Sequence, residues 1–334
     1  MKTKTPTIIL SRTDNLGDVI LTLPMAGLLR CYFPQATLYF IGKSYTAPLI
    51  TGSRYVDHFL DREALLADPQ KLKELKADTI LFVFPDKPLA QLAKQAKIPL
   101  RIGTSHRVFH WFTCNQLVHF SRKRSSQHEA QLNLKLLKPL SLPTEASLVD
   151  FPAWYGLQAA PLAPVWKAYL SSDKFNLILH PKSKGSAREW GLENYEQLAK
   201  SLSPDRFQLF ITGSPVEKAL IYQEKPSIFQ LPHVTDLTGK FTLEELMSFI
   251  NEVDGLLACS TGPLHIAAAL GKYALGLYPT RRPMHPGRWQ PLGKKASYLC
   301  LDKACQACRK SGDCACILAI SVARVKATIE KWEK

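Results

Sequence analysis

Short apolar segments alternate with helix-like segments along the whole chain, and this alternation constrains the fold more than any other feature. The runs "FNLILH" at 175–180 and "FQLFITG" at 207–213 are almost continuously apolar, which is typical of strands buried on both faces. Between them, "LENYEQLAKSL" at 192–202 carries its apolar residues at helical spacing. Strands that alternate with helices form βαβ units, so the sequence predicts an α/β fold with doubly wound parallel sheets.

The same pattern occurs in both halves of the chain, joined by a proline-rich segment. Four prolines fall within 142–174, a density that indicates a linker or an irregular crossover. We therefore predict two Rossmann-like domains, residues 1–160 and 161–334, with a cleft between them and ligands at the carboxyl ends of the strands. The predicted strands are 8–10, 36–42, 78–84, 117–121, 175–180, 207–213, 254–260 and 273–279, and the predicted helices are 18–33, 45–50, 89–97, 129–140, 192–202, the residues after Pro215, 242–253 and 262–271.

The composition is that of a globular protein with a strong positive charge. Of the 334 residues, 46% are hydrophobic and 21% are charged, which excludes an intrinsically disordered chain. No apolar run approaches the roughly 18 to 20 residues that cross a bilayer, and the apolar run near the N-terminus is too short for a signal peptide. We therefore expect a cytoplasmic protein. We also expect it to be a monomer. The net charge of +15 favours polyanionic partners: nucleic acid, an anionic membrane or phosphorylated substrates.

The first predicted strand leads into a turn that lacks the glycine-rich pattern of a phosphate loop. The turn "SRTDNLGD" holds one glycine, Gly17, and the acid Asp18 stands at the start of the next helix. An acid at a helix N-terminus repels phosphate but suits the helix dipole, which is expected to keep Asp18 ionised. One interpretation is therefore an acid that merely caps its helix. Gly17 would allow another group to approach the backbone closely.

A candidate anion site follows the strand predicted at 175–180. The loop "HPKSKGSAREW" contains Ser183, Lys184 and Arg188 around a glycine. Hydroxyl groups, backbone N–H groups beside a glycine and two cations are what a diphosphate needs. A solvated basic loop is the alternative, but the position at the carboxyl end of a strand favours phosphate binding.

Two further strand-to-helix turns of the second half are candidates. In "CSTGPLHIAAALG", Ser260 or Thr261 can cap the helix, Pro263 suits its first turn, and the free N–H groups together with His265 can hold an anion. By itself this turn is better explained as a well-capped core helix. In "TGSPVEKAL", Glu217 lies in the first helical turn, where an acid suits the dipole; it can also accept hydrogen bonds from ribose hydroxyl groups.

The segment 101–128 combines basic and aromatic residues and contains no acid. It holds five Lys or Arg residues and four His residues, interleaved with Phe109, Trp111, Phe112 and Phe120. Three interpretations stay open. The segment can stack single-stranded nucleic acid, it can meet anionic lipid headgroups, or it can be a mixture of core residues and a solvated loop.

Five of the eight cysteines lie within 300–316. Cys305 and Cys308 have the C-x-x-C spacing of a zinc half-site, whereas Cys314 and Cys316 are closer together than is usual. A metal site formed by these four cysteines, holding zinc or an iron–sulfur cluster, is one interpretation. Unligated or partly oxidised thiols are the favoured one.

Together these motifs resemble glycosyltransferase family nine, the heptosyltransferases of lipopolysaccharide core synthesis. The matching stretches are "SRTDNLGDVILTLP", "HEAQLNLKLL", "HPKSKGSAREW", "TGSPVEKAL", "STGPLHIAAALG" and "CILAISVARV", in family order. The resemblance implies a GT-B fold of two Rossmann-like domains and a metal-independent, inverting transfer of a sugar from a nucleotide donor, without a cofactor. It implies ADP-heptose as the donor, and a lipopolysaccharide core or lipid A glycolipid as the acceptor. The enzyme would act at the inner face of the inner membrane of a Gram-negative bacterium.

The resemblance also implies a role for individual residues. Asp18 matches the family's proposed catalytic base, on an N-terminal domain that binds the acceptor, and the C-terminal domain would bind the donor. We assign the basic run Arg122, Lys123 and Arg124 to the acceptor and the membrane. The donor-binding positions are Ser183, Lys184, Arg188, Glu217, Ser260, Thr261, Gly262, Pro263 and His265. Many members carry Asp where this chain has Ser260.

Rival functions are less compatible with the motifs. A nicotinamide-dependent dehydrogenase needs a G-x-G-x-x-G turn after its first strand, and "SRTDNLGD" has none. A nucleic-acid-binding protein fits the charge, but the sequence has no recognition-helix, RRM or KH signature. A nucleotide-sugar epimerase of similar fold is the closest alternative.

Overall fold

The computed structural model describes residues 5–122, 125–282, 284–301 and 314–334. The chain divides into two compact units, Met1–Gln158 (unit 1) and Ala159–Lys334 (unit 2), close to the division predicted near residue 160. Among the described residues, no helix combines the length and the apolar character needed to cross a membrane.

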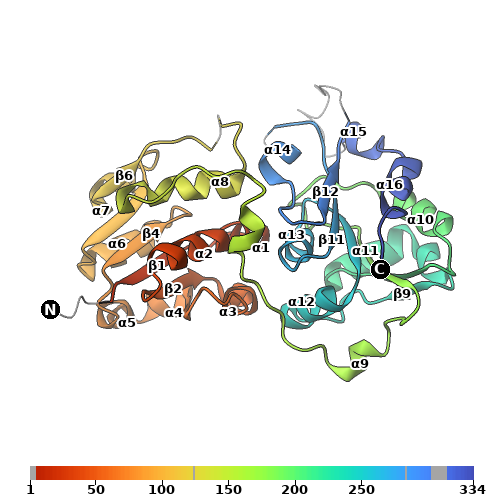
Figure 1. Ribbon diagram of the computed structural model, residues 1–334, viewed down its shortest axis with the longest axis horizontal. Coiled ribbons are helices and arrows are strands. Elements are labelled where there is room, and N and C mark those ends of the chain that lie inside the picture. Colours follow the sequence, from red (N-terminus) through yellow and green to blue (C-terminus); the bar gives the residue numbers. More distant parts are fainter. Residues whose placement is uncertain (1–4, 123–124, 283, 302–313) are drawn as a thin grey trace. The chain divides into compact units, whose positions relative to one another are not determined.

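Unit 1 is built on a parallel sheet. Its described strands pair in the order β3-β2-β1-β4-β5-β6, and every pairing is parallel. The central strand β1 is buried along Ile8–Leu10, which explains its continuous apolar sequence (Figure 1). The strands are β1 (Thr7–Ser11), β2 (Thr37–Gly42), β3 (His58–Asp61), β4 (Thr79–Phe82), β5 (Leu100–Thr104) and β6 (Gln116–Val118).

Two predicted helices of unit 1 are interrupted at prolines. The predicted helix 18–33 is divided into α1 and α2, because Pro24 in the first turn of α2 has no N–H to donate to a carbonyl group of the preceding turn. The predicted helix 129–140 is α8 followed by the 3-10 helix η2, which contains Pro139. The helical elements are α1 (Leu16–Ile20), α2 (Leu23–Tyr32), η1 (Ser44–Thr46), α3 (Ala47–Thr51), α4 (Arg62–Ala67), α5 (Pro69–Glu74), α6 (Lys87–Gln95), α7 (Val108–Thr113), α8 (Glu129–Leu134), η2 (Lys135–Leu140) and η3 (Phe151–Trp154).

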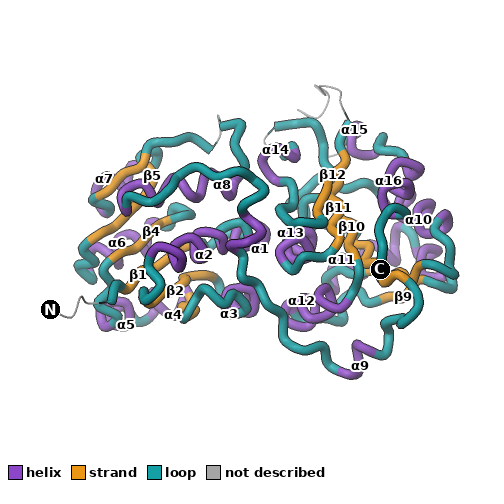
Figure 2. The backbone as a smooth tube through the Cα atoms, in the orientation of Figure 1, coloured by secondary structure: helices purple, strands orange, loops and turns teal. Residues whose placement is uncertain are grey.

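Unit 2 repeats the strand order of unit 1. Its described strands pair in parallel in the order β12-β11-β10-β7-β8-β9, and Figure 2 shows β12, β11 and β10 side by side. The predicted α/β fold with doubly wound parallel sheets is confirmed. The elements are α9 (Pro164–Lys167), β7 (Phe175–His180), α10 (Leu192–Ser201), β8 (Phe207–Ile211), α11 (Pro215–Glu224), η4 (Pro226–Gln230), β9 (Val234–Asp236), α12 (Leu243–Glu252), β10 (Gly255–Cys259), α13 (Gly262–Ala269), β11 (Tyr273–Leu277), α14 (Pro286–Trp289), β12 (Ala296–Leu299), α15 (Ala315–Leu318) and α16 (Val322–Ile329).

In both sheets the strand order reverses beside the first strand of the unit. β1 lies between β2 and β4, and β7 lies between β8 and β10. At such a reversal the loops that leave the two central strands diverge, and ligands of doubly wound sheets bind there, at the carboxyl ends. The segments at these ends are 12–18 and 83–86 in unit 1, and 181–190 and 260–265 in unit 2.

The end of segment 181–190 is fixed in the core of unit 2. Trp190 is fully buried, its Nε1 donates to Ile320 O at 2.8 Å, and its ring meets Tyr195 edge-on. Farther along the chain, Trp332 stacks on Tyr273 with 5.1 Å between the ring centroids. The C-terminal residues therefore help to hold the loop that follows β7.

Helix α2 packs so closely on η3 that a side chain at Gly27 has no room. A Cβ atom at this position would meet Trp154 O and would lie 2.8 Å from Trp154 Cα. We expect Gly27→Ala to lower the free energy of unfolding of unit 1 by about 1–3 kcal/mol. In an ordinary helix, replacing Gly by Ala raises the free energy of unfolding by about 0.5–1 kcal/mol. The sign of the change therefore shows whether Gly27 is closely packed.

Urea unfolding followed by circular dichroism measures this change. A free energy of unfolding equal to or above that of the wild type would contradict the close packing of α2 on η3.

Candidate active site

A buried arginine organises the carboxyl end of β1. Arg12 directly follows the strand and is 3% exposed. Its Nε and Nη2 donate to the two carboxylate oxygens of Asp14 at 2.7 and 2.9 Å. Nη2 also donates to Asp18 Oδ1, and Nη1 donates to Glu129 Oε1 at 3.1 Å. One guanidinium group thus holds three carboxylates, and Asp18 is one of them.

A second arginine shares Glu129. Arg122 Nε donates to Glu129 Oε1 at 2.8 Å, and Arg122 Nη2 donates to Asn133 Oδ1 at 3.0 Å and to Val83 O at 3.1 Å. The basic run predicted to meet the acceptor and the membrane therefore begins with a residue engaged inside unit 1. Lys123 and Arg124 lie outside the described residues.

Helix α8 also fixes the backbone beside Asp18. Asn133 Nδ2 donates to Leu21 O at 3.0 Å and to Thr22 Oγ1 at 3.3 Å. Thr22 Oγ1 in turn donates to Asp18 O at 2.9 Å. The main chain and the carboxylate of Asp18 are therefore connected, through Thr22 and Arg12, to residues more than one hundred positions later in the sequence.

The electrostatic environment of Asp18 differs from the expected one. We expected the dipole of its helix to keep it ionised. Instead, burial raises the pKa of Asp18 to about 6; the cation Arg12 opposes this rise, and Asp14 and Glu129 add to it. Burial also works against the charge of Arg12, but the three carboxylates outweigh it and raise the pKa of the guanidinium group above its ordinary value. Asp18 is therefore a carboxylate near neutral pH that can still accept a proton.

A second ion pair lies at the carboxyl end of β4. Asp86, 6% exposed, accepts from Arg62 Nε at 2.6 Å and from Thr13 Oγ1 at 3.1 Å. It also caps α6 by accepting from Leu89 N at 3.2 Å. The turns after β1 and β4 are thereby joined at the point where the strand order reverses.

In unit 2, the loop 181–190 is held by two glutamates. Buried Ser183 donates its N–H and its hydroxyl to Glu189 Oε1 at 2.9 and 3.0 Å. Lys184 donates its N–H to Glu217 Oε1 at 3.1 Å. These two N–H groups, which we expected an anion to use, therefore donate to carboxylates. The side chain of Lys184 is exposed, and Arg188 is half-buried.

Glu217 joins the loops that follow β7 and β8. Its Oε2 accepts from Ser214 N at 2.6 Å in a capping box at the start of α11, a contact that the sequence analysis did not predict. Nearby, His180 Nδ1 and Thr212 Oγ1 are 2.9 Å apart. Burial lowers the pKa of His180, so this ring is neutral near pH 7. Gly185, at φ +77°, allows the left-handed turn of the loop.

Helix α13 begins where the sequence predicts. Thr261 is the N-cap, Gly262 is the first helical residue, Pro263 follows, and Ser260 is half-buried just before the cap. The Oγ1 of Thr261 is buried and has no hydrogen-bond partner in the part of the chain that the structure describes. A buried hydroxyl group without a hydrogen-bond partner costs stability. A ligand that forms a hydrogen bond with the Thr261 hydroxyl group would remove that cost. His265 is buried in the first turn.

The cysteine-rich segment is described only in part. Cys305 and Cys308 lie outside the described residues. Cys314 and Cys316 are buried, with their Sγ atoms 3.1 Å apart. No group of three or more His, Cys, Asp or Glu side chains within the described ranges is arranged to hold a metal ion.

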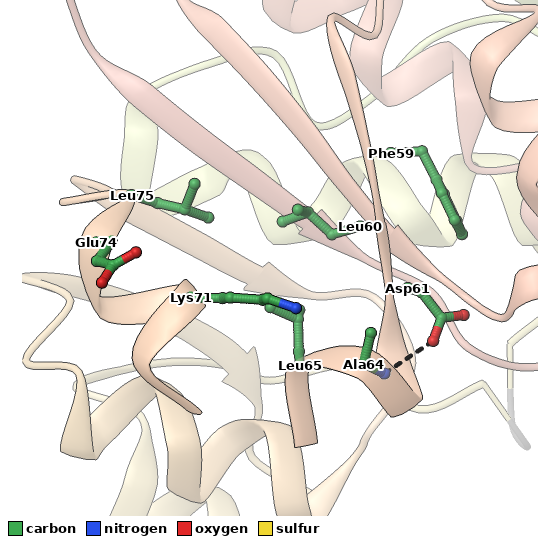
Figure 3. Close-up of a pocket in the computed structure, with 8 residues that line it drawn as sticks. All are labelled: Phe59, Leu60, Asp61, Ala64, Leu65, Lys71, Glu74 and Leu75. Atoms are coloured by element: carbon green, nitrogen blue, oxygen red, sulfur yellow. Dashed lines mark hydrogen bonds between the residues drawn. The ribbon is translucent and has the colours of Figure 1, made fainter. Parts of the chain in front are cut away.

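A pocket of about 360 Å³ opens in unit 1 between β3, α4 and α5 (Figure 3). Its lining is mostly apolar, with Lys71 and Glu74 at one end and Asp61 at the other. Asp61 caps α4 by accepting from Ala64 N at 2.8 Å. The pocket contains none of the site residues predicted from the sequence.

Sequence reasoning missed the residues that hold the predicted ones in place. In unit 1 these are Arg12 and Glu129, and in unit 2 they are Glu189 and Lys182, whose Nζ lies 3.4 Å from Glu189 Oε2 and 2.8 Å from Glu224 Oε2. Arg12 lies within the turn "SRTDNLGD", and Glu129 lies in the stretch "HEAQLNLKLL" that carries part of the family resemblance. The missing signal was the contact between them.

The double role of Glu217 predicts an unequal response at two capping boxes. Glu217→Gln replaces an acceptor oxygen by an NH₂ group that faces backbone N–H donors, and we expect it to lower the free energy of unfolding of unit 2 by about 1–3 kcal/mol. The comparison is Glu245→Gln in the capping box of α12, where the half-buried glutamate accepts from Thr242 N at 2.8 Å and from Trp166 Nε1 at 3.1 Å. Thermal and urea unfolding compare the two variants; equal losses would contradict a special role of the Lys184 contact.

Comparisons with known proteins agree with this architecture. Lipopolysaccharide core heptosyltransferase OpsX from Haemophilus influenzae is 24% identical over 307 residues, which cover 86% of this chain and 82% of that protein. The structure of E. coli ADP-heptose lps heptosyltransferase II is 20% identical, with a TM-score of 0.76 over 97% of each chain. That of E. coli heptosyltransferase WaaC with ADP is 16% identical, with a TM-score of 0.72 over 97% of this chain and 99% of that one. Both structures share the fold of this chain.

The family model described as glycosyltransferase family 9 (heptosyltransferase) matches residues 69–316, well over half of the chain. The match includes β4, β5 and β6 of the first sheet, the whole described second sheet, and the loops at the carboxyl ends of β4, β7, β8 and β10. The chain is a GT-B glycosyltransferase and belongs to glycosyltransferase family 9, the heptosyltransferase family.

Proposed function

We propose that this glycosyltransferase moves heptose from ADP-heptose to a lipopolysaccharide core or lipid A glycolipid, with inversion and without a metal ion. The donor is suggested by the E. coli relatives, one of which is an ADP-heptose enzyme and another of which binds ADP and ADP-2-deoxy-2-fluoro heptose. The acceptor is suggested by OpsX, a lipopolysaccharide core heptosyltransferase. Family membership favours transfer over the epimerase alternative.

The observation that carries the proposal is the half-buried carboxylate of Asp18 on the buried Arg12. Inverting transfer needs a base that removes the proton of the acceptor hydroxyl group while its oxygen attacks the anomeric carbon. The bond between that carbon and the donor diphosphate breaks on the opposite face, and the proton stays on Asp18. A carboxylate with a pKa of about 6 is ionised at neutral pH and close enough to it to accept a proton efficiently.

Unit 2 would stabilise the departing diphosphate. Its candidate groups are the side chains of Lys184 and Arg188 and the N-terminal end of α13, where the Thr261 hydroxyl group is available. Each carboxylate oxygen of Glu217 accepts a hydrogen bond from one backbone N–H group and keeps a second lone pair. It can therefore also accept a hydrogen bond from a ribose hydroxyl group. Ser260, Gly262, Pro263 and His265 complete the proposed donor site.

The acceptor sets where the enzyme works. A phosphorylated glycolipid is held in a membrane, so we place the enzyme peripherally at the inner face of the inner membrane of a Gram-negative bacterium.

The reaction is tested by incubating the enzyme with ADP-heptose and a core-deficient glycolipid and measuring the mass of the product by mass spectrometry. A parallel thermal-shift screen of ADP-, UDP- and GDP-sugars tests the donor, because a bound ligand raises the unfolding temperature. Turnover of the donor without an acceptor would favour an epimerase.

Asp18→Asn tests the base. We expect kcat to fall by about 10²- to 10⁴-fold while the thermal shift produced by ADP-heptose is unchanged, because only proton removal is lost. Asp14→Asn is the matched control, since it removes the neighbouring carboxylate on Arg12 and leaves the base; its kcat should fall far less. Near-normal turnover of Asp18→Asn with normal donor binding would exclude the assignment.

The pH dependence tests the electrostatics. The base works when deprotonated, so kcat should rise with pH through about 6, the pKa to which burial raises Asp18. Arg12 favours the ionised form of Asp18. Removing the charge in Arg12→Met should therefore move the rising limb of the kcat–pH profile to higher pH. Arg12→Lys keeps the charge and should move it less. A limb that stays in place in Arg12→Met would show that another group titrates.

A further inference from the structure

Helix α7 exposes an apolar face that nothing in the described part of unit 1 covers. Val108, Trp111 and Phe112 are 75, 63 and 70% exposed, and the spacing i, i+3, i+4 puts them on one side of the helix. Leu117 on the neighbouring edge strand β6 is 36% exposed. These four residues, which we call the α7 face, lie within ten positions of the chain.

The opposite side of α7 is firmly packed, so the exposed side chains are held outward. His110 is fully buried and its Nδ1 lies 2.9 Å from Thr104 O, and Phe109 packs against the core of unit 1. Trp111 Nε1 donates to Ser105 O at 2.8 Å. The polar atom of the indole is therefore satisfied within the protein, and the exposed remainder of the ring is apolar.

The surroundings of the α7 face are positively charged. The stretch 87–128, which runs through α6, β5, α7 and β6, contains eight Lys or Arg residues and no Asp or Glu. Helix α6 packs against α7, and its exposed lysines include Lys87 and Lys94, with Lys97 just beyond. Arg107, directly before α7, is exposed as well.

This combination selects an anionic lipid surface over the other polyanions. Apolar and aromatic side chains enter the headgroup region of a bilayer while neighbouring cations attract anionic headgroups. A single-stranded nucleic acid would stack its bases on aromatic rings, and the aliphatic Val108 and Leu117 offer none. The four side chains expose on the order of 400 Å², about half of what each partner buries in a stable protein interface.

We propose that the α7 face inserts into the headgroup region of an anionic bilayer and docks unit 1 on the membrane. The inference deepens the proposed function. Only the purpose of the docking, which would bring the enzyme to a glycolipid acceptor, rests on that proposed function. It shifts the membrane contact from Arg122, which is engaged by Glu129, to residues 107–117.

Sedimentation with lipid vesicles tests the docking. The full chain is mixed with vesicles of phosphatidylcholine alone or of phosphatidylcholine with phosphatidylglycerol. We expect the wild type to bind the anionic vesicles more tightly, and to lose binding at high salt as the exposed charges are screened. Equal binding to both kinds of vesicle would overturn the anionic part of the proposal.

A matched pair of variants locates the contact. Val108→Asp changes the first residue of α7, and the control Val216→Asp changes a valine that is 69% exposed in the first turn of α11. An acid suits the first turn of a helix, so both variants should fold. Vesicle binding should weaken by about tenfold or more in Val108→Asp, as expected for a charge placed at the membrane interface, and not in Val216→Asp. Binding by Val108→Asp at the wild-type level would overturn the proposal.

Two further measurements separate the docking from the alternatives. Brominated lipids should quench the fluorescence of Trp111, so Trp111→Phe should lose part of the quenching; unchanged quenching would overturn insertion. A wild-type dimer that dissociates in Val108→Asp, with vesicle binding unaltered, would also overturn it.

Heptose transfer to a lipid-free core oligosaccharide should be equal in Val108→Asp and the wild type. Absence of transfer by the wild type would refute the proposed function and leave the vesicle result to decide the docking.

Discussion

The site of unit 1 depends on the buried guanidinium group of Arg12. It is surrounded by Asp14, Asp18 and Glu129, and the last of these is shared with Arg122. Removing one partner from such a buried cluster costs about 3–5 kcal/mol, because it leaves a charge without its counterpart. The same contacts fix the rotamer of Asp18 and restrain its pKa. The carboxylate proposed as the base thus belongs to an ion cluster that also connects the first strand to α8.

The two units place opposite chemistry at equivalent positions of the same strand order. After its first strand, unit 1 presents an acid that a cation holds. After its first strand, unit 2 presents cations on a loop that acids hold, with Glu189 and Glu217 accepting the N–H groups of Ser183 and Lys184. In both cases the group presented has the charge opposite to that of the group that holds it. A base and a cationic leaving-group site can therefore be built on one repeated architecture.

The sequence predicted the strands at the centre of each sheet and the edge strand β6, and it missed the edge strands β3, β9 and β12 and the inner strand β5. The buried strands β1, β4, β7 and β10 are continuous apolar runs, whereas β3, β9 and β12 are short edge strands with partly exposed residues and carry no such signal. The same limit applied to the site. Asp18 and Thr261 directly follow their strands and stand out locally, but the contact of Arg12 with Glu129 spans 117 positions, and no local pattern reports it. Arg122 belonged to a run that we assigned to the acceptor and the membrane, because its partner Glu129 lies beyond the run and the contact is not visible in the sequence.

That separation along the chain has a consequence for biosynthesis. Asp18 leaves the ribosome more than one hundred residues before Glu129 and Asn133, which complete its environment. Contacts of such long sequence separation form late, since the intervening chain must first be ordered. Until α8 has been made and has packed on the start of the chain, Arg12 lacks its contact with Glu129, and the backbone beside Asp18 lacks its hydrogen bond from Asn133. The environment of Asp18 is therefore completed only after the whole of unit 1 up to α8 has been synthesised.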